Sequence, residues 1–119
     1  MKNTLVFGAS LKSNRYSNIA INRLTGKEIE TYGFGLKEGI VSGVEIKTNL
    51  EEFKNIHTVT LYMNPQRQAE YYDAIVNIAP QRVIFNPGTE NPEFYSILQD
   101  NGIEVEVACT LVLLATEQY

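Results

Sequence analysis

The chain has 119 residues, of which 44% are hydrophobic and 20% charged, and its formal net charge is −4. This composition excludes a largely disordered chain, and the negative charge argues against nucleic-acid binding, which depends on Lys and Arg contacts to phosphates. The single cysteine, Cys109, excludes an internal disulfide bond. Apolar runs are too short to span a bilayer and the first residues lack a signal-peptide pattern, so we expect a cytoplasmic protein with one domain over residues 1–119.

The first half of the chain alternates predicted strands and helices. The predicted elements are a strand over residues 4–7, a helix over 16–24, a strand over 28–34, an edge strand or loop over 44–46, and one helical turn over 49–53. The first strand is a short apolar run that stops at Gly8, which is typical of a buried strand in a parallel sheet. Gly26 stands where a helix C-cap glycine belongs.

The second half continues the alternation. Its predicted elements are a strand over residues 57–63, a helix over 66–78, a strand over 82–85, a helix over 92–99, a strand over 103–107, and a short closing segment over 109–116. Pro80 stops one helix, while Asn91 as N-cap and Pro92 at the first helical position begin the next. Alternating strands and helices predict an α/β protein, a Rossmann-like three-layer αβα sandwich with a mostly parallel sheet.

The turn after the first strand is the most informative candidate site, because ligands of such sheets bind beyond the carboxyl ends of the strands. Gly8, Ala9 and Ser10 are small enough for backbone amides to approach a phosphate. A helix that begins near residues 16–18 directs free amides and its positive dipole end to the same place. Lys12 and Arg15 add two positive charges. The alternative is an ordinary strand-to-helix loop with both side chains in solvent.

This turn does not have the usual dinucleotide fingerprint. The GxGxxG pattern would require glycines at positions 10 and 13, where the chain has Ser10 and Ser13. An NAD site also requires an acid at the end of the second strand, and none occurs there before Glu38. Lys37 would instead suit a phosphate on the ribose, so the residues favour a ligand with an additional phosphate over NAD.

On these residues the chain resembles the stand-alone CoA-binding domain proteins, small Rossmann-like proteins similar to the CoA-binding domain of succinyl-CoA synthetase α subunits. The matching segments are residues 8–10, Lys12, residues 14–18, residues 35–39, residues 64–65, residues 86–91 and residues 109–110. The resemblance implies that coenzyme A is the ligand and that its diphosphate lies on the first turn. It places the adenosine near residues 35–37 and the pantetheine arm toward Asn64, Asn86 and Cys109. Ser13 departs from the family, whose members often carry proline there.

These arguments together predict a site without metal or assigned catalytic residues. The expected CoA-binding residues are Gly8, Ala9, Ser10, Lys12, Arg15, Tyr16, Ser17, Asn18, Gly35, Lys37, Asn64, Asn86, Gly88 and Cys109. The expected partner is therefore a small nucleotide ligand, with no nucleic acid and no membrane, and the protein would be a monomer or a homodimer.

Several residues have two interpretations. Cys109 could form a mixed disulfide with CoA or act in redox sensing, or it could be an ordinary buried cysteine. Glu90 could act in catalysis or hydrogen-bond its own loop, and His57 is expected at the start of a strand, on the edge of the sheet opposite the ligand. The leading hypothesis is CoA binding without catalysis. The alternatives are an NADP- or acyl-CoA-linked enzyme or a redox-regulatory protein that uses Cys109, and an interaction module without a ligand.

Overall fold

The computed structural model describes residues 2–50 and 53–119, and within them seven strands form one sheet in the order β3-β4-β2-β1-β5-β6-β7. The strands are β1 (Thr4–Ala9), β2 (Thr31–Gly35), β3 (Gly39–Val41), β4 (Val44–Lys47), β5 (Thr58–Leu61), β6 (Arg82–Phe85) and β7 (Glu104–Val107). Only the pairing of β3 with β4 is antiparallel. The predicted α/β fold with a mostly parallel sheet is confirmed.

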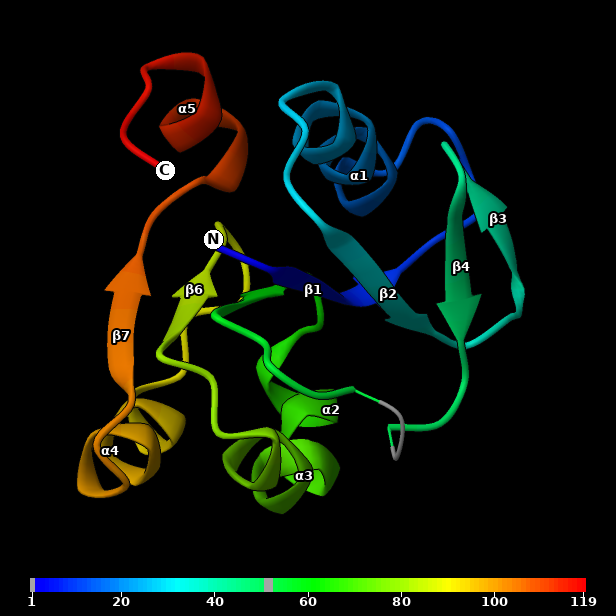
Figure 1. Cartoon of the computed structure of the whole chain (residues 1–119). Coiled ribbons are helices and arrows are strands. Elements are labelled where there is room, and N and C mark those ends of the chain that lie inside the picture. Colours follow the sequence, from blue (N-terminus) through cyan, green and yellow to red (C-terminus); the bar gives the residue numbers. More distant parts are fainter. Residues whose placement is uncertain (1, 51–52) are drawn as a thin grey trace.

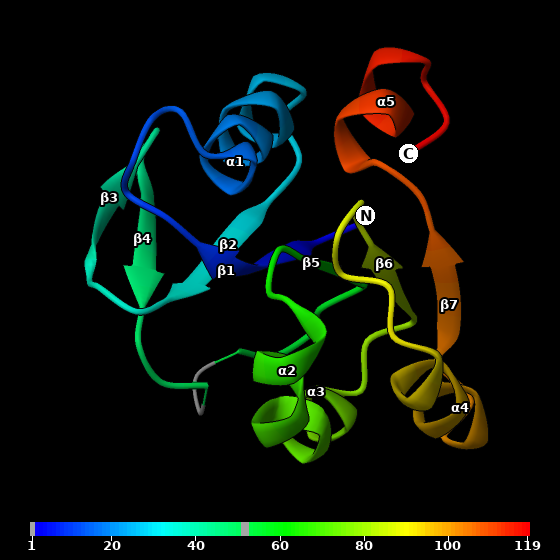
Figure 2. The same cartoon turned by 180° about the vertical axis from the view of Figure 1, so that it is seen from behind.

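Helices cover both faces of the sheet, which makes three layers. They are α1 (Tyr16–Gly26), α2 (Pro65–Gln68), the 3₁₀ helix η1 (Ala69–Tyr71), α3 (Tyr72–Ile78), α4 (Pro92–Asp100) and α5 (Thr110–Ala115). Helices α1 and α5 lie on one face, and α2, α3 and α4 lie on the other (Figure 1). The view from behind shows the same two groups (Figure 2). None of the described helices combines the length and the apolar character needed to cross a membrane.

Strand β1 supplies side chains to both faces of the sheet. Leu5 and Phe7 belong to the core cluster beneath α3 and α4, while Val6 belongs to the cluster beneath α1. Regular alternation would return residue 8 to the side of Val6, but a bulge between Phe7 and Ala9 places Ala9 there instead. Gly8, with φ +98°, adopts the backbone conformation that this bulge requires. The end of β1 is therefore turned locally, just where the candidate site begins.

The topology places β1 at the point where the chain reverses its direction of travel across the sheet. From β1 the chain passes through α1 to β2 on one side, and from β5 it passes through α2 and α3 to β6 on the other. Because α1 and α2 lie on opposite faces of the sheet (Figure 1), the loops after β1 and β5 turn toward opposite sides of it. Such a switch point is the usual ligand site of open α/β sheets.

Two predictions about the second quarter of the chain are wrong in detail. The second strand begins at Thr31, not at residue 28, because Glu28 has a left-handed backbone (φ 60°) and the Ile29 amide still bonds to Leu24 at the end of α1. The segment 44–46 is a strand but not an edge, since β4 pairs with β2 on one side and with β3 on the other. The helical turn expected over residues 49–53 includes residues 51 and 52, which lie outside the described residues.

Two further differences concern strand β3 and the helix expected over residues 66–78. Strand β3 was not predicted, because its hairpin depends on a tight turn in which Ser42 and Gly43 both have positive φ. The helix expected over residues 66–78 is divided into α2, η1 and α3. At Tyr71 the backbone leaves the helical region (φ −111°, ψ 3°), and its ring packs edge-on against Phe7 and Phe34. The interruption between α2 and α3 therefore coincides with the packing of the Tyr71 ring in the core.

Candidate functional site

A cleft of about 710 Å³ opens at the carboxyl ends of β1, β2, β5 and β6. Most of the residues expected from the sequence line it: Gly8, Ala9, Ser10, Lys12, Arg15, Tyr16, Ser17, Gly35, Lys37, Asn64 and Gly88. Its volume lies in the usual range for small-molecule sites. The cleft coincides with the switch point of the sheet, so topology and shape indicate the same place.

Hydrogen bonds fix the loop between β1 and α1. The Ser10 amide donates to Ser17 Oγ (3.2 Å), and Asn18 Nδ2 donates to the Ser10 carbonyl (2.9 Å). Ser17 and Asn18 are both 4% exposed, and Asn18 is not among the cleft-lining residues, so its amide shapes the loop from behind. No side chain caps the first turn of α1. The amides of that turn therefore remain available, at the positive end of an 11-residue helix.

Every charged side chain that lines the cleft, among the described residues, is a cation. These are Lys12, Arg15, Lys37 and Arg67. None of the four forms an ion pair with a described carboxylate, although the chain as a whole carries a net charge of −4. A concave surface lined by one sign of charge concentrates ligands of the opposite sign. The cleft is therefore suited to a ligand with several negative charges.

Arg67 is the cation that sequence reasoning missed. It lies in α2, which begins after β5 on the face opposite α1 (Figure 1), and it lines the same cleft as Arg15, the residue before α1. Asn64 caps this short helix by accepting a hydrogen bond from the Arg67 amide at 3.0 Å. The sequence Asn64-Pro65 is a helix-start signal, and it could have placed position 67 in the first turn of a helix at this edge.

The end of β2 forms the wall on the other side of β1. A Cβ atom on Gly35 would collide with the backbone carbonyl of Ala9, because the end of β1 lies directly against this glycine. Leu11 and Leu36 line the cleft here and are 42% and 71% exposed. Exposed leucines beside Lys37 give this end an apolar surface next to a positive charge. The remaining lining residues that were not predicted are Phe34, Tyr62, Met63, Pro87 and Thr89.

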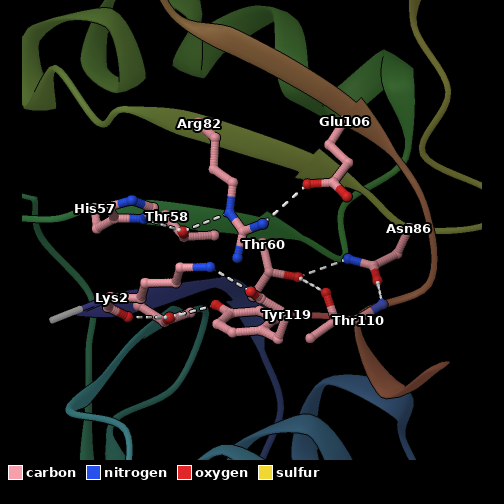
Figure 3. Close-up of polar contacts among 10 residues, drawn as sticks. Lys2, His57, Thr58, Thr60, Arg82, Asn86, Glu106, Thr110 and Tyr119 are labelled. Atoms are coloured by element: carbon pink, nitrogen blue, oxygen red, sulfur yellow. Dashed lines mark hydrogen bonds and ion pairs between the residues drawn. The ribbon is translucent and has the colours of Figure 1, made fainter. Parts of the chain in front are cut away.

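Asn86 does not line the cleft, because its side chain is used within the protein. It is 2% exposed; Nδ2 donates to Thr60 Oγ1 (2.7 Å) and to the Leu61 carbonyl (2.8 Å). Oδ1 accepts from the Thr110 amide at 2.8 Å (Figure 3). Asn86 therefore joins the ends of β5 and β6 to the start of α5, beneath the cleft floor.

Cys109 and Glu90 are the two other residues that were considered for a chemical role. Cys109 is partly buried at the N-cap position of α5 and is not among the cleft-lining residues. Glu90 accepts a hydrogen bond from the Gly88 amide (2.8 Å), which is the loop interaction weighed against catalysis. The geometry thus gives Glu90 a role in holding the loop that carries Gly88.

A buried polar cluster lies at the amino ends of β5 and β6, at the other end of these strands from the cleft (Figure 3). Arg82 Nη1 pairs with Glu106 Oε1 at 2.9 Å, and the Arg82 guanidinium lies 4.5 Å from the ring centre of Tyr119. His57 Nδ1 lies 2.7 Å from Thr58 Oγ1, and burial, together with the charge of Arg82, lowers the pKa of the imidazole. His57 thus precedes β5 on the edge away from the cleft, as expected. No cluster of described His, Cys, Asp or Glu residues could hold a metal ion.

The parallel sheet, its switch point and the cation-lined cleft define a Rossmann-like domain of the ligand-binding class. The family model described as "CoA binding domain" matches residues 2–115, and the chain belongs to this family. The family supports CoA binding in general. The resemblance inferred from the sequence is thereby confirmed.

Several solved structures share this fold. The chain is similar to an uncharacterized protein of known crystal structure, with 44% identity over 100% of this chain and 98% of the other, and a TM-score of 0.96. It is also similar to a hypothetical protein from Pyrococcus horikoshii OT3 (22% identity, 98% of this chain and 83% of that chain, TM-score 0.87). A Thermus thermophilus structure shows the same fold (19% identity, 99% and 91% coverage, TM-score 0.87). No curated protein matches the chain.

Proposed function

We propose that the chain binds coenzyme A or a CoA thioester in the cleft through the loop between β1 and α1, without catalysis of its own. The observation that carries this proposal is the set of four cations that line a cleft with no described carboxylate, at the switch point of the sheet. Coenzyme A carries a diphosphate and a separate 3′-phosphate. Its charge therefore matches a cleft whose cations extend over the ends of three neighbouring strands.

The diphosphate is assigned to the cleft at the ends of β1 and β5. Lys12 and Arg15 lie on the β1 side, together with the uncapped amides of α1, and Arg67 lies on the β5 side. A helix N-terminus and flexible cations on both sides are a favourable environment for two adjoining phosphates. Arg67 thus adds a contact to those expected from the sequence.

The two ends of the ligand extend in opposite directions from the diphosphate. Lys37 is available to the 3′-phosphate, and the exposed side chains of Leu11 and Leu36 offer apolar surface to the adenine. The pantetheine arm would cross the ends of β5 and β6, along Met63, Asn64 and Gly88. These three residues are uncharged, which suits an uncharged amide chain.

The chemistry of the cleft supports binding without turnover. Among the described lining residues there is no carboxylate, imidazole or thiol, so the titratable side chains are the four cations and two tyrosines, Tyr16 and Tyr62. Burial raises the pKa of Tyr62 to about 12, which keeps its hydroxyl protonated at neutral pH. General acid–base catalysis requires a group whose pKa lies near the working pH.

Calorimetric titration with CoA, 3′-dephospho-CoA and NAD tests the proposal. We expect CoA to bind tightest and loss of the 3′-phosphate to weaken binding about tenfold, because a hydrogen bond to a charged group contributes about 1.5–3 kcal/mol. Lys37→Gln should remove most of the difference between CoA and 3′-dephospho-CoA. Absence of both heat and a melting shift with millimolar CoA would refute the assignment.

A further inference from the structure

Gln68 is a fully buried amide next to the cleft. Its residue exposure is 0%, although Arg67 and Ala69 on either side of it are exposed. Its Nε2 donates to the Met63 carbonyl at 2.8 Å and to the Thr89 carbonyl at 2.9 Å. A buried amide is costly unless its hydrogen-bonding groups are satisfied, and both hydrogens of this one go to backbone carbonyls of different loops.

The remaining atom of the amide is also used. Gln68 Oε1 accepts from Asn91 Nδ2 at 2.9 Å, and the second hydrogen of that nitrogen goes to the Tyr72 hydroxyl at 2.8 Å. Asn91 Oδ1 accepts from the Phe94 amide, which caps α4. The orientation of the Gln68 amide is forced, because only its NH₂ group can face two carbonyl oxygens.

Met63 and Thr89, whose carbonyls receive these bonds, both line the cleft. Met63 follows β5, and Thr89 lies in the loop after β6. The amide and the hydroxyl of Thr89 both donate to the Asn86 carbonyl, which ties the loop to its own strand. The bond from Gln68 Nε2 to the Thr89 carbonyl ties this loop to α2.

We propose that Gln68 is a positioning residue: its amide fixes the distance between the Met63 and Thr89 walls and so preorganises the half of the cleft assigned to the pantetheine arm. This inference rests on the proposed function. Gln68 itself does not line the cleft, so it acts through the two loops. Fixing a site in its bound geometry raises affinity because less ordering remains to be done on binding.

The test uses Gln68→Met, which keeps the length of the side chain and removes its donors. The control is Gln66→Met, the same change at an exposed position of α2 that does not line the cleft. Without ligand, we expect faster amide hydrogen exchange at residues 88–91 of Gln68→Met, with exchange in the loop of residues 10–15 unchanged. Equal exchange in Gln68→Met and the wild type would overturn the inference.

The ligand readout separates positioning from general destabilisation. We expect Gln68→Met to bind CoA about tenfold more weakly, because the two loops must then be ordered when the ligand binds. Its affinity for adenosine 3′,5′-bisphosphate, which contains no pantetheine, should stay within about twofold of the wild type. Equal losses for both ligands, or no loss for either, would contradict the inference.

Two further outcomes must be told apart from a loss of positioning by Gln68. If the wild type binds neither ligand, the proposed function fails, while the exchange measurement still decides whether Gln68 holds the two loops. If Gln68→Met does not fold, Asn91→Ser takes its place, because serine still caps a helix but cannot donate as Asn91 does to Gln68 Oε1. The same split between the two ligands is then expected at smaller size, and equal affinities would count against the inference.

Discussion

The carbonyl oxygen of Ala9 occupies the space that a Cβ atom on Gly35 would need. The two residues are partners at the carboxyl ends of β1 and β2, after the bulge at Gly8. Both line the cleft. The close approach of these two backbones therefore shapes the cleft between the loop that follows β1 and Lys37.

Gly35→Ala should destabilise the protein. The obstacle is backbone in the middle of the sheet, which cannot move aside as a flexible side chain can, so we expect the free energy of unfolding to fall by about 2–3 kcal/mol. Urea denaturation measures this change. Gly26→Ala is the control, because nothing lies within 4 Å of the added Cβ at the end of α1; there the change should be neutral or stabilising by up to about 1 kcal/mol. Equal stability of the two variants would contradict the steric account.

The buried hydroxyl of Tyr62 leads us to expect that the protein loses stability at alkaline pH. Its hydroxyl is buried near the side chains of Thr60 and Thr110, and burial raises its pKa to about 12. The folded state therefore keeps this proton in the pH range in which the unfolded state, with a pKa of 10.0, loses it. Between pH 10 and 12 stability should fall as pH rises, by about 2–3 kcal/mol in total for a shift of this size.

Denaturation of Tyr62→Phe at pH 7 and pH 11.5 measures this contribution. The variant should be about as stable as the wild type at pH 7, since the buried hydroxyl makes no hydrogen bond of good geometry with the described residues. It should lose less stability than the wild type at pH 11.5. A residual loss is expected because burial also raises the pKa of Tyr119. Identical pH profiles would exclude the burial of Tyr62 as a cause.

The ion pair between Arg82 and Glu106 predicts a large loss of stability when one partner is removed. Arg82→Met leaves Glu106, whose side chain is 29% exposed, without its cation, and removes the hydrogen bond that Arg82 Nε donates to Thr58 Oγ1. We expect a loss of about 2–4 kcal/mol, which thermal or urea unfolding would measure. Adding Glu106→Gln should recover part of this loss, because no unpaired carboxylate remains. If the double variant is no more stable than Arg82→Met, the carboxylate is not the source of the cost.

The general fold could be predicted from the sequence because its signals are local. The apolar strand at residues 4–7 and the helix start at Asn91-Pro92 depend on their own side chains, and both occur in the structure. The break of the expected helix at Tyr71 and the strand β3 depend on contacts or turn conformations that the residue types alone do not specify. Such tertiary effects override local propensity.

The candidate site shows the same division. The first turn was predictable since a strand, small residues and cations follow one another in the chain. Asn86 was expected at the ligand, but whether an asparagine faces a ligand or the interior depends on partners distant in sequence, here Thr60 and Thr110. Arg67 and the buried Gln68 were missed for the same reason, because only the folded chain brings α2 to the cleft.

The most direct test of CoA binding at this cleft is calorimetric titration of CoA into Arg15→Gln and Arg23→Gln beside the wild type. Both are exposed arginines near or in α1, but only Arg15 lines the cleft. We expect Arg15→Gln to weaken CoA binding at least about tenfold and to reduce its dependence on salt, while Arg23→Gln stays within about twofold. Equal affinity of the two variants for CoA would contradict the placement of the diphosphate at the loop between β1 and α1.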